Sequence, residues 1–210
     1  MAQPQEDAPW WDKFSALGSR DAPLYSKETL LRQFNILGDI LNAGTLLIDV
    51  RRTDHEGGTI LGSLNMPAQS FPYHMATLYR LCHGDGVNVI SRVMFYCGSS
   101  NGRGPRCAAW FKDYCAQRAE AEGIPENMAD PQVFTLEGGI KGWVAGGLPY
   151  RAQVEGYDEA YWMQFDEVKT AGKRTVNSSI GDDAMEEDGE DNQAKRRVLG
   201  MKGPGGSSVK

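Results

Sequence analysis

One cysteine and one arginine, with five residues between them, form the part of the sequence best suited to chemistry. Cys97 follows the apolar run VMFY at 93–96, and Arg103 closes a loop of small and polar residues: Gly98, Ser99, Ser100, Asn101 and Gly102. Backbone N–H groups in such a loop can converge on one point and bind an anion. A helix that begins directly afterwards adds unpaired N–H groups, and a guanidinium binds two oxygens of the same anion. The spacing therefore predicts a loop that binds a tetrahedral oxyanion.

The same positive field acts on the cysteine sulfur. Thiols beside helix N-termini and cations lose their proton readily, so we expect Cys97 to be largely a thiolate at neutral pH. Such a thiolate can attack the central atom of the oxyanion and form a covalent intermediate, while Arg103 and the loop amides stabilise the transition state. The alternative is a buried cysteine before an ordinary glycine-rich turn. The apolar run before the loop and the Gly-Pro step after it favour the chemical interpretation.

The segments around this loop predict alternating strands and helices. Apolar runs predict buried strands at 45–50 and 93–96 and a further strand at 133–136, and a short strand is predicted at 64–66. Helical spacing and capping residues predict helices after Ser26, over 77–81 with an end at 84–86, from Pro105, from Gly138-Gly139 and over 157–169. The alternation indicates an α/β fold, a central parallel sheet with helices on both faces. Ligands bind such sheets beyond the carboxyl ends of the strands, where the pattern places Asp49, Cys97 and Glu137.

The chain divides into four predicted parts. Residues 1–24 form an N-terminal arm, whose Trp10 and Trp11 we expect to pack on the domain rather than to bind a partner. Residues 25–155 form the catalytic domain, and 156–169 form a C-terminal helix. From 170 to 210, an acidic run and few apolar residues predict a disordered tail. The basic triplet at 195–197 is either a nuclear signal or part of a solvated tail, and we favour the second.

Composition argues against several classes of protein. The net charge of -6 and the pI of about 5.1 argue against a nucleic-acid surface, and no apolar run is long enough for a membrane span. The N-terminus lacks the pattern of a secretory signal, so we expect a cytoplasmic and, if the basic triplet acts, nuclear location. Four cysteines without a C-x-x-C pair predict neither a zinc site nor a disulfide scaffold. We therefore expect no metal and no bound cofactor.

The segment CGSSNGRGPR resembles the active-site loop of the rhodanese-fold phosphatases that activate cyclin-dependent kinases, and equally that of the fungal arsenate reductases. The segments LLIDVRRTDHEGGTILGSLNMP and VFTLEGGIKGWVAGGLP resemble the first and last rhodanese signatures. This resemblance covers about 25–150. It implies a rhodanese-like fold, with Cys97 as nucleophile, Arg103 as oxyanion clamp, and Asp49 and Arg51 as structural support. The loop length also resembles this branch, because five residues separate Cys97 from Arg103. The sulfurtransferases have four residues after the cysteine.

The sequence departs from the phosphatase pattern in ways that bear on proton transfer. Tyr96 precedes the nucleophile where the phosphatases have histidine, and the loop contains no acidic residue. A general acid for the leaving group must therefore come from elsewhere. Glu56, Asp54 and Glu137 are candidates at the rim, and a salt-bridge or capping role is the favoured alternative for each. Cys107 is either a buried structural residue, which we favour, or a partner for Cys97 after oxidation.

Two reactions suit the predicted loop. The first is hydrolysis of a phosphomonoester, phosphotyrosine and phosphothreonine proteins included, through a phosphocysteine intermediate. The alternative is reduction of arsenate, in which glutathione and glutaredoxin act as external thiol partners. Sulfur transfer and a non-catalytic phospho-binding module are less favoured, because of the loop length and because both Cys97 and Arg103 are present. The absence of carboxylates from the loop slightly favours arsenate, whereas a general substrate favours the phosphatase. Taken together, we favour the phosphatase by a small margin.

Overall fold

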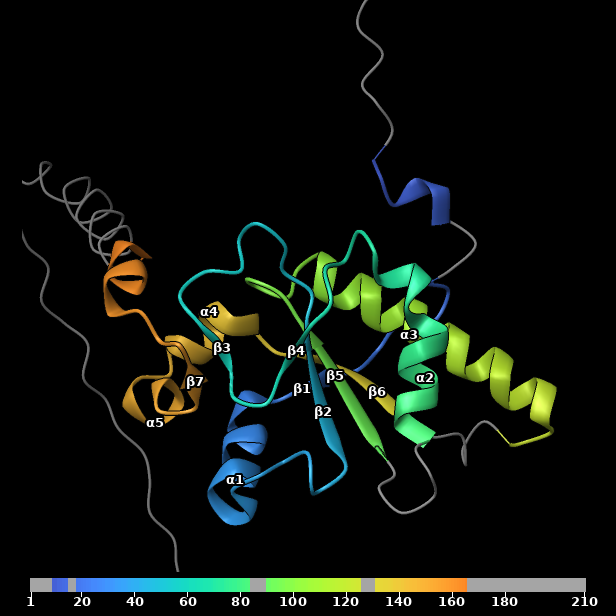
Figure 1. Cartoon of the computed structure of the whole chain (residues 1–210), viewed down its shortest axis with the longest axis horizontal. Coiled ribbons are helices and arrows are strands. Elements are labelled where there is room, and N and C mark those ends of the chain that lie inside the picture. The colour runs from blue at the N-terminus through green and yellow to red at the C-terminus, as the bar shows by residue number, and fades with distance from the viewer. Residues whose placement is uncertain (1–8, 15–17, 84–89, 126–130, 166–210) are drawn as a thin grey trace, which may run out of the picture. The chain divides into compact units, whose positions relative to one another are not determined.

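A five-stranded parallel sheet forms the centre of the computed structural model, which describes residues 9–14, 18–83, 90–125 and 131–165 (Figure 1). The strands lie in the order β1 (Leu24–Tyr25), β6 (Gln132–Leu136), β5 (Arg92–Tyr96), β2 (Thr45–Asp49) and β4 (Leu64–Asn65). All neighbouring pairs are parallel. The predicted α/β fold with a central parallel sheet is thus confirmed. A separate two-stranded antiparallel sheet joins β3 (Thr59–Ile60) to β7 (Val154–Glu155).

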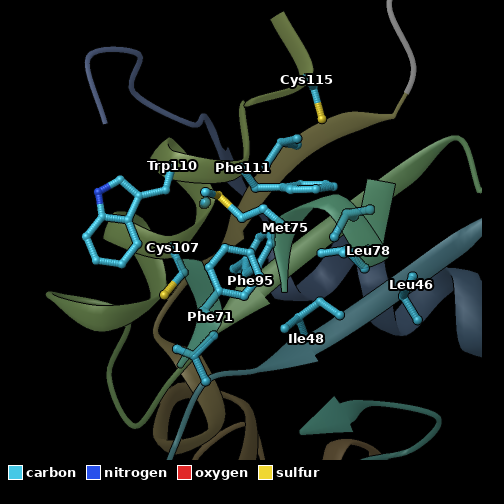
Figure 2. Close-up of a cluster of buried hydrophobic side chains, with 14 of the residues drawn as sticks. Leu46, Ile48, Phe71, Met75, Leu78, Phe95, Cys107, Trp110, Phe111 and Cys115 are labelled. Carbon is cyan, nitrogen blue, oxygen red and sulfur yellow. The ribbon is translucent and has the colours of Figure 1, made fainter. Parts of the chain in front are cut away.

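Helices cover both faces of the large sheet. On one face, α2 (Met75–His83) and α3 (Arg103–Glu122) pack on Leu46, Ile48 and Phe95; Figure 2 shows this cluster. On the other face, α1 (Lys27–Leu37) and α4 (Gly139–Val144) pack on Leu47 and Met94. Successive strand residues point to opposite faces, so both faces of a central strand need apolar residues. This is why all five residues of β2 are buried and why its sequence is a continuous apolar run.

Local sequence signals explain where the helices begin and end. Ser26 caps α1, and its Oγ accepts a hydrogen bond of 3.2 Å from the Thr29 amide, as the capping pattern predicts. Gly123 ends α3 with φ 68°, where its N–H donates to the carbonyls of Ala119 and Glu120. The start of α3 at Arg103, two residues before Pro105, is earlier than predicted. The arginine of the loop therefore belongs to the first turn of the helix.

Most predicted elements are confirmed, and their bounds differ by one or two residues. Helix α2 is longer than the predicted 77–81, and its predicted end at 84–86 lies outside the described residues. Residues 159–165 are helical within the predicted segment 157–169, of which 166–169 also lie outside. The predicted disordered tail, 170–210, lies outside the described residues as well. Prediction missed the short elements β1, β3, β7 and α5 (Leu148–Arg151), together with 3-10 turns at Asp12–Phe14 and Phe71–Tyr73.

The N-terminal arm packs on the domain through its aromatic residues, as predicted. The ring of Trp10 meets Trp110 edge to face at 6.0 Å, and Phe14 meets the same ring at 5.5 Å. The guanidinium carbon of Arg106 lies 4.0 Å from the ring centre of Trp11, a cation–π contact. Trp110 and Arg106 both belong to α3, and Phe14 also meets Tyr73 edge to face at 5.8 Å. None of the described helices combines the length and apolar character that crossing a membrane requires.

Candidate active site

The predicted loop lies at the carboxyl edge of the sheet, between β5 and α3. Cys97 follows Tyr96, the last residue of β5, and Arg103 is the first residue of α3. Asp49, at the end of the neighbouring strand β2, is in register with Tyr96. Cys97 is 4% exposed and belongs to the cluster that also contains Phe95 and Cys107. The structure therefore brings Cys97, Arg103 and Asp49 to one edge of the sheet, where Cys97 is buried against the apolar cluster.

The start of α4 holds two peptide groups of the loop in place. The amide of Ile140 donates to the Cys97 carbonyl at 3.0 Å, and that of Lys141 donates to the Gly98 carbonyl at 2.9 Å. In a planar trans peptide, the N–H points opposite to the preceding carbonyl. The N–H groups of Gly98 and Ser99 are consequently directed away from α4. This orientation is what an inward-facing set of anion donors requires.

Gly139 makes this approach of α4 to the loop possible. Its φ is 56°, and a Cβ atom at this position would lie 2.4 Å from the Cys97 carbonyl oxygen. No side chain fits at that distance, and L residues resist that backbone conformation. The glycine pair at 138–139 was predicted to open a helix. Its second role, a contact with the loop that begins at Cys97, follows only from the folded structure.

The remaining loop residues differ in exposure. Ser100 is the one non-glycine residue with positive φ, 54°, among the residues described, and its hydroxyl is buried with no hydrogen-bond partner there. Ser99 and Asn101 are exposed, whereas Gly102 is half-buried and precedes α3 directly. The first N–H groups of a helix have no partner within the helix. The loop thus has a buried hydroxyl and backbone donors available to an anion.

Arg103 forms an ion pair that the sequence did not assign. Its Nη1 donates to Oδ1 of Asp54 at 2.7 Å, and its Nη2 pairs with Oδ2 of the same carboxylate. The side chains are 28% and 44% exposed. The hydrogen bond from Arg103 lowers the pKa of Asp54 well below its usual range, although partial burial opposes the shift. Of the two alternatives for Asp54, the structure shows the salt bridge, and an ionised Asp54 has no proton to donate at neutral pH.

A second, fully buried ion pair lies beneath the loop that follows β2. Asp49 accepts hydrogen bonds from Nε and Nη2 of Arg51 at 3.0 and 2.7 Å. Arg51 also donates to the carbonyls of Glu56 and Gly58 at 2.9 and 2.6 Å. These bonds shape the backbone of 51–58, the segment that carries Asp54. The buried pair therefore supports the residue that contacts Arg103.

The other candidate residues differ from Asp54 in their contacts. The side chains of Glu56 and Glu137 are exposed, and within the described ranges neither has a hydrogen bond or ion pair to the loop. Tyr96 points to the opposite face of the sheet, where its hydroxyl bonds Thr59 and Ser63 at 2.8 Å each. The Nε2 atom of His55 lies 3.4 Å from Asp49. That places its ring against the buried carboxylate.

The three remaining cysteines are buried thiols. Burial raises the pKa of Cys82 and of Cys115 to about 12. Burial also raises the pKa of Cys107, and the electrostatic influence of Cys97 adds to that rise. All four cysteines are free. In the described part of the chain, no three or more His, Cys, Asp or Glu side chains gather as a metal site would need.

A parallel α/β sheet with a cysteine loop at its carboxyl edge defines the class of this protein. Residues 34–146 match the model of the Rhodanese-like domain, and the chain belongs to that family. It is 32% identical over 109 residues to "Arsenate reductase 2.1" of Oryza sativa subsp. japonica, covering 51% of this chain and 61% of that protein. It is also 32% identical over 104 residues to "Dual specificity phosphatase Cdc25" of Arabidopsis thaliana, covering 49% and 64%.

The chain spans less than two thirds of the length of either relative. Among solved structures, it is similar to yeast Ygr203w, described as a protein tyrosine phosphatase of the rhodanese family. That likeness has a TM-score of 0.52 at 19% identity and covers 68% of this chain and 98% of that one. It shows the shared fold. The family assignment rests on the match over 34–146, and the two relatives are named as an arsenate reductase and a phosphatase.

Proposed function

We propose that the protein is a cysteine-dependent phosphatase that hydrolyses phosphomonoesters, with phosphotyrosine or phosphothreonine proteins as the natural substrate class. The observation that carries the proposal is the loop between Cys97 and Arg103. A cysteine at its inner end, amides turned away from α4 and a guanidinium at the start of α3 match the needs of phosphoryl transfer. The phosphatase relative supports the same reaction.

The reaction proceeds in two displacements. The Cys97 thiolate attacks phosphorus, the P–O bond to the alcohol breaks, and a phosphocysteine forms. Water then attacks phosphorus, the S–P bond breaks, and inorganic phosphate leaves with the thiolate restored. Loop amides and Arg103 stabilise the equatorial oxygens in both steps. The leaving alcohol needs a proton, for which the exposed Glu56 and Glu137 are the candidate donors, since Asp54 is held ionised.

Arsenate reduction is the second candidate, and the state of Asp54 favours it. Without a carboxylic acid beside the loop, a hydroxide leaving arsenic is easier to expel than an alcohol leaving phosphorus. Cys97 would attack As(V) and displace water. Two thiols, from glutathione or glutaredoxin, would then be oxidised to a disulfide. Their two electrons would reduce As(V) to As(III), the S–As bond would break, and arsenite would leave with the Cys97 thiol restored. The relative named arsenate reductase supports this alternative.

Three parallel assays on the full chain separate these reactions. They use p-nitrophenyl phosphate, arsenate with glutathione and glutaredoxin, and thiosulfate with cyanide. We expect phosphate release that Cys97→Ser abolishes and that Cys82→Ala, a buried cysteine of α2, leaves intact. Activity in the arsenate assay alone establishes the second candidate. Phosphate release that persists unchanged in Cys97→Ser disproves the assignment of the nucleophile.

A further inference from the structure

The ion pair between Arg103 and Asp54 connects the two loops at the carboxyl edge of the sheet. The carboxylate comes from 49 residues earlier in the chain, and the loop from Cys97 to Arg103 contains no acidic residue of its own. A carboxylate on the predicted oxyanion clamp has two opposite consequences. It either competes with the substrate for the guanidinium, or it orients the guanidinium for the substrate.

The geometry of the pair decides between these consequences. A guanidinium has five N–H donors arranged in one plane. Asp54 bonds Nη1 and Nη2, one with each oxygen, and so occupies the edge between these two nitrogens. A second edge remains, formed by Nε–H and the outer N–H of the neighbouring Nη. That edge can bind two oxygens of an anion while Asp54 stays in place.

Two further observations support orientation over competition. The pKa of Arg103 is raised, first by its hydrogen bonds to Asp54 and then by the charges of Asp54, Cys97 and Asp49. The guanidinium thus lies in the field of the nucleophile as well as in that of the carboxylate. In addition, the buried Arg51 bonds the carbonyls of 56 and 58, which fixes the segment that carries Asp54. A support held this firmly restricts Arg103 before any substrate arrives.

The geometry points to Asp54 as a positioning residue, which holds Arg103 end-on so that the free edge of the guanidinium faces an oxyanion in the loop. An arginine side chain loses substantial rotamer freedom when it is fixed. Fixing it in advance lowers that loss at the moment of binding. This role deepens the proposed function, and its effect on oxyanion binding is independent of whether turnover follows.

The test measures oxyanion binding separately from turnover. Inorganic phosphate or arsenate is titrated against alkylation of Cys97 by iodoacetamide, with kcat and KM for p-nitrophenyl phosphate measured in parallel. For Asp54→Asn, we expect the half-protecting oxyanion concentration to rise, and kcat/KM to fall, by about tenfold, within the roughly 30-fold that arginine rotamer freedom allows. Asp54→Glu, which keeps the carboxylate, should retain more of both.

A structural defect would behave differently. Asp54→Asn removes a negative charge near the nucleophile, so alkylation without oxyanion should be no slower than in the wild type, whereas a loosened loop would slow alkylation and turnover together. Repeating the substitution in Arg103→Lys, which cannot form a fork, should give a smaller change in oxyanion protection. The control Glu159→Gln removes an exposed carboxylate elsewhere and should change nothing.

Each outcome bears on one claim. Tighter oxyanion binding or faster turnover in Asp54→Asn makes the carboxylate a competitor and overturns the inference. An equal loss in the Arg103→Lys background overturns it too, because the effect would not pass through Arg103. If the wild type binds oxyanion in an Asp54-dependent way without hydrolysing phosphomonoesters, the proposed function fails while the inference stands. If hydrolysis depends on Cys97 and Asp54→Asn changes nothing, the function stands and the inference fails.

Discussion

Two loops leave neighbouring strands at the same edge of the sheet, and they are held in different ways. The loop at 51–58, after β2, is shaped by a side chain, since Arg51 pairs with Asp49 and bonds carbonyls of 56 and 58. The loop at 97–102, after β5, is held by backbone contacts, since α4 amides bond the carbonyls of Cys97 and Gly98. We therefore expect the first loop to be disrupted by the loss of one charged side chain, and the second by the addition of one methyl group.

The two ion pairs at this edge differ in how far they are buried. Asp49 and Arg51 have side chains that are 0% and 2% exposed, against 44% and 28% for Asp54 and Arg103. A buried pair is strongly destabilised when one partner is lost, whereas an exposed pair contributes little to stability. The buried pair therefore serves the fold. The half-exposed pair contributes little to the free energy of unfolding. We therefore interpret it through its proposed effect on oxyanion binding.

The largest effect on stability should come from the buried pair. Arg51→Met leaves the Asp49 carboxylate buried without its cation, and we expect the free energy of unfolding to fall by about 3–5 kcal/mol. Urea denaturation measures this change through the midpoint, provided that the slope stays constant. A loss below about 1 kcal/mol, the range of exposed pairs, would remove the distinction between the two pairs.

The loop held by backbone contacts should respond to a single methyl group. Gly139→Ala places a Cβ 2.4 Å from the Cys97 carbonyl oxygen at φ 56°, so we expect a loss of roughly 3 kcal/mol from strain and displacement together. Activity should fall with it. The matched control is Gly62→Ala, at φ 76° with open space around the Cβ position, which should cost about 1 kcal/mol. Equal losses in the two variants would mean that contact with the loop has no role.

Asp54→Asn should have a small effect on stability that depends on pH. The pKa of Asp54 is lowered in the folded state by its hydrogen bond from Arg103, so the pair stabilises the fold above the ordinary carboxyl value, near ~3.9. That contribution is lost as pH falls below this value. At neutral pH we expect a change of about 1 kcal/mol or less. Urea unfolding from pH 7 to about pH 3 should show a shallower acid loss in the variant, and an unchanged slope would contradict the pairing.

Ser100→Ala should have the smallest effect on stability. The hydroxyl is buried without a partner in the described structure, so its removal should change the free energy of unfolding by no more than about 0.5 kcal/mol. Phosphate protection of Cys97 should nevertheless weaken roughly tenfold, because a hydrogen bond to a charged acceptor contributes about 1.5 kcal/mol. Unchanged protection would show that backbone donors alone hold the anion.

Sequence patterns predicted the elements and left their contacts open. Continuous apolar runs predicted the buried strands β2, β5 and β6, because strands covered on both faces need apolar residues throughout. The capping role of Ser26 was equally local. The two-residue strands β1, β3 and β7 were missed, because segments that short have no periodicity to detect; of the two-residue strands, β4 alone was predicted, within 64–66.

For the candidate site, the sequence by itself determined which residues stand at the two ends of the loop. The five-residue spacing between Cys97 and Arg103, and the strand and helix around it, are properties of one continuous segment. Only the tertiary structure decided that Asp54, and not Glu56 or Glu137, meets Arg103, and that Gly139 lies against Cys97. Those contacts depend on strand order and helix packing, which join segments about 40 or more residues apart, beyond the reach of local pattern.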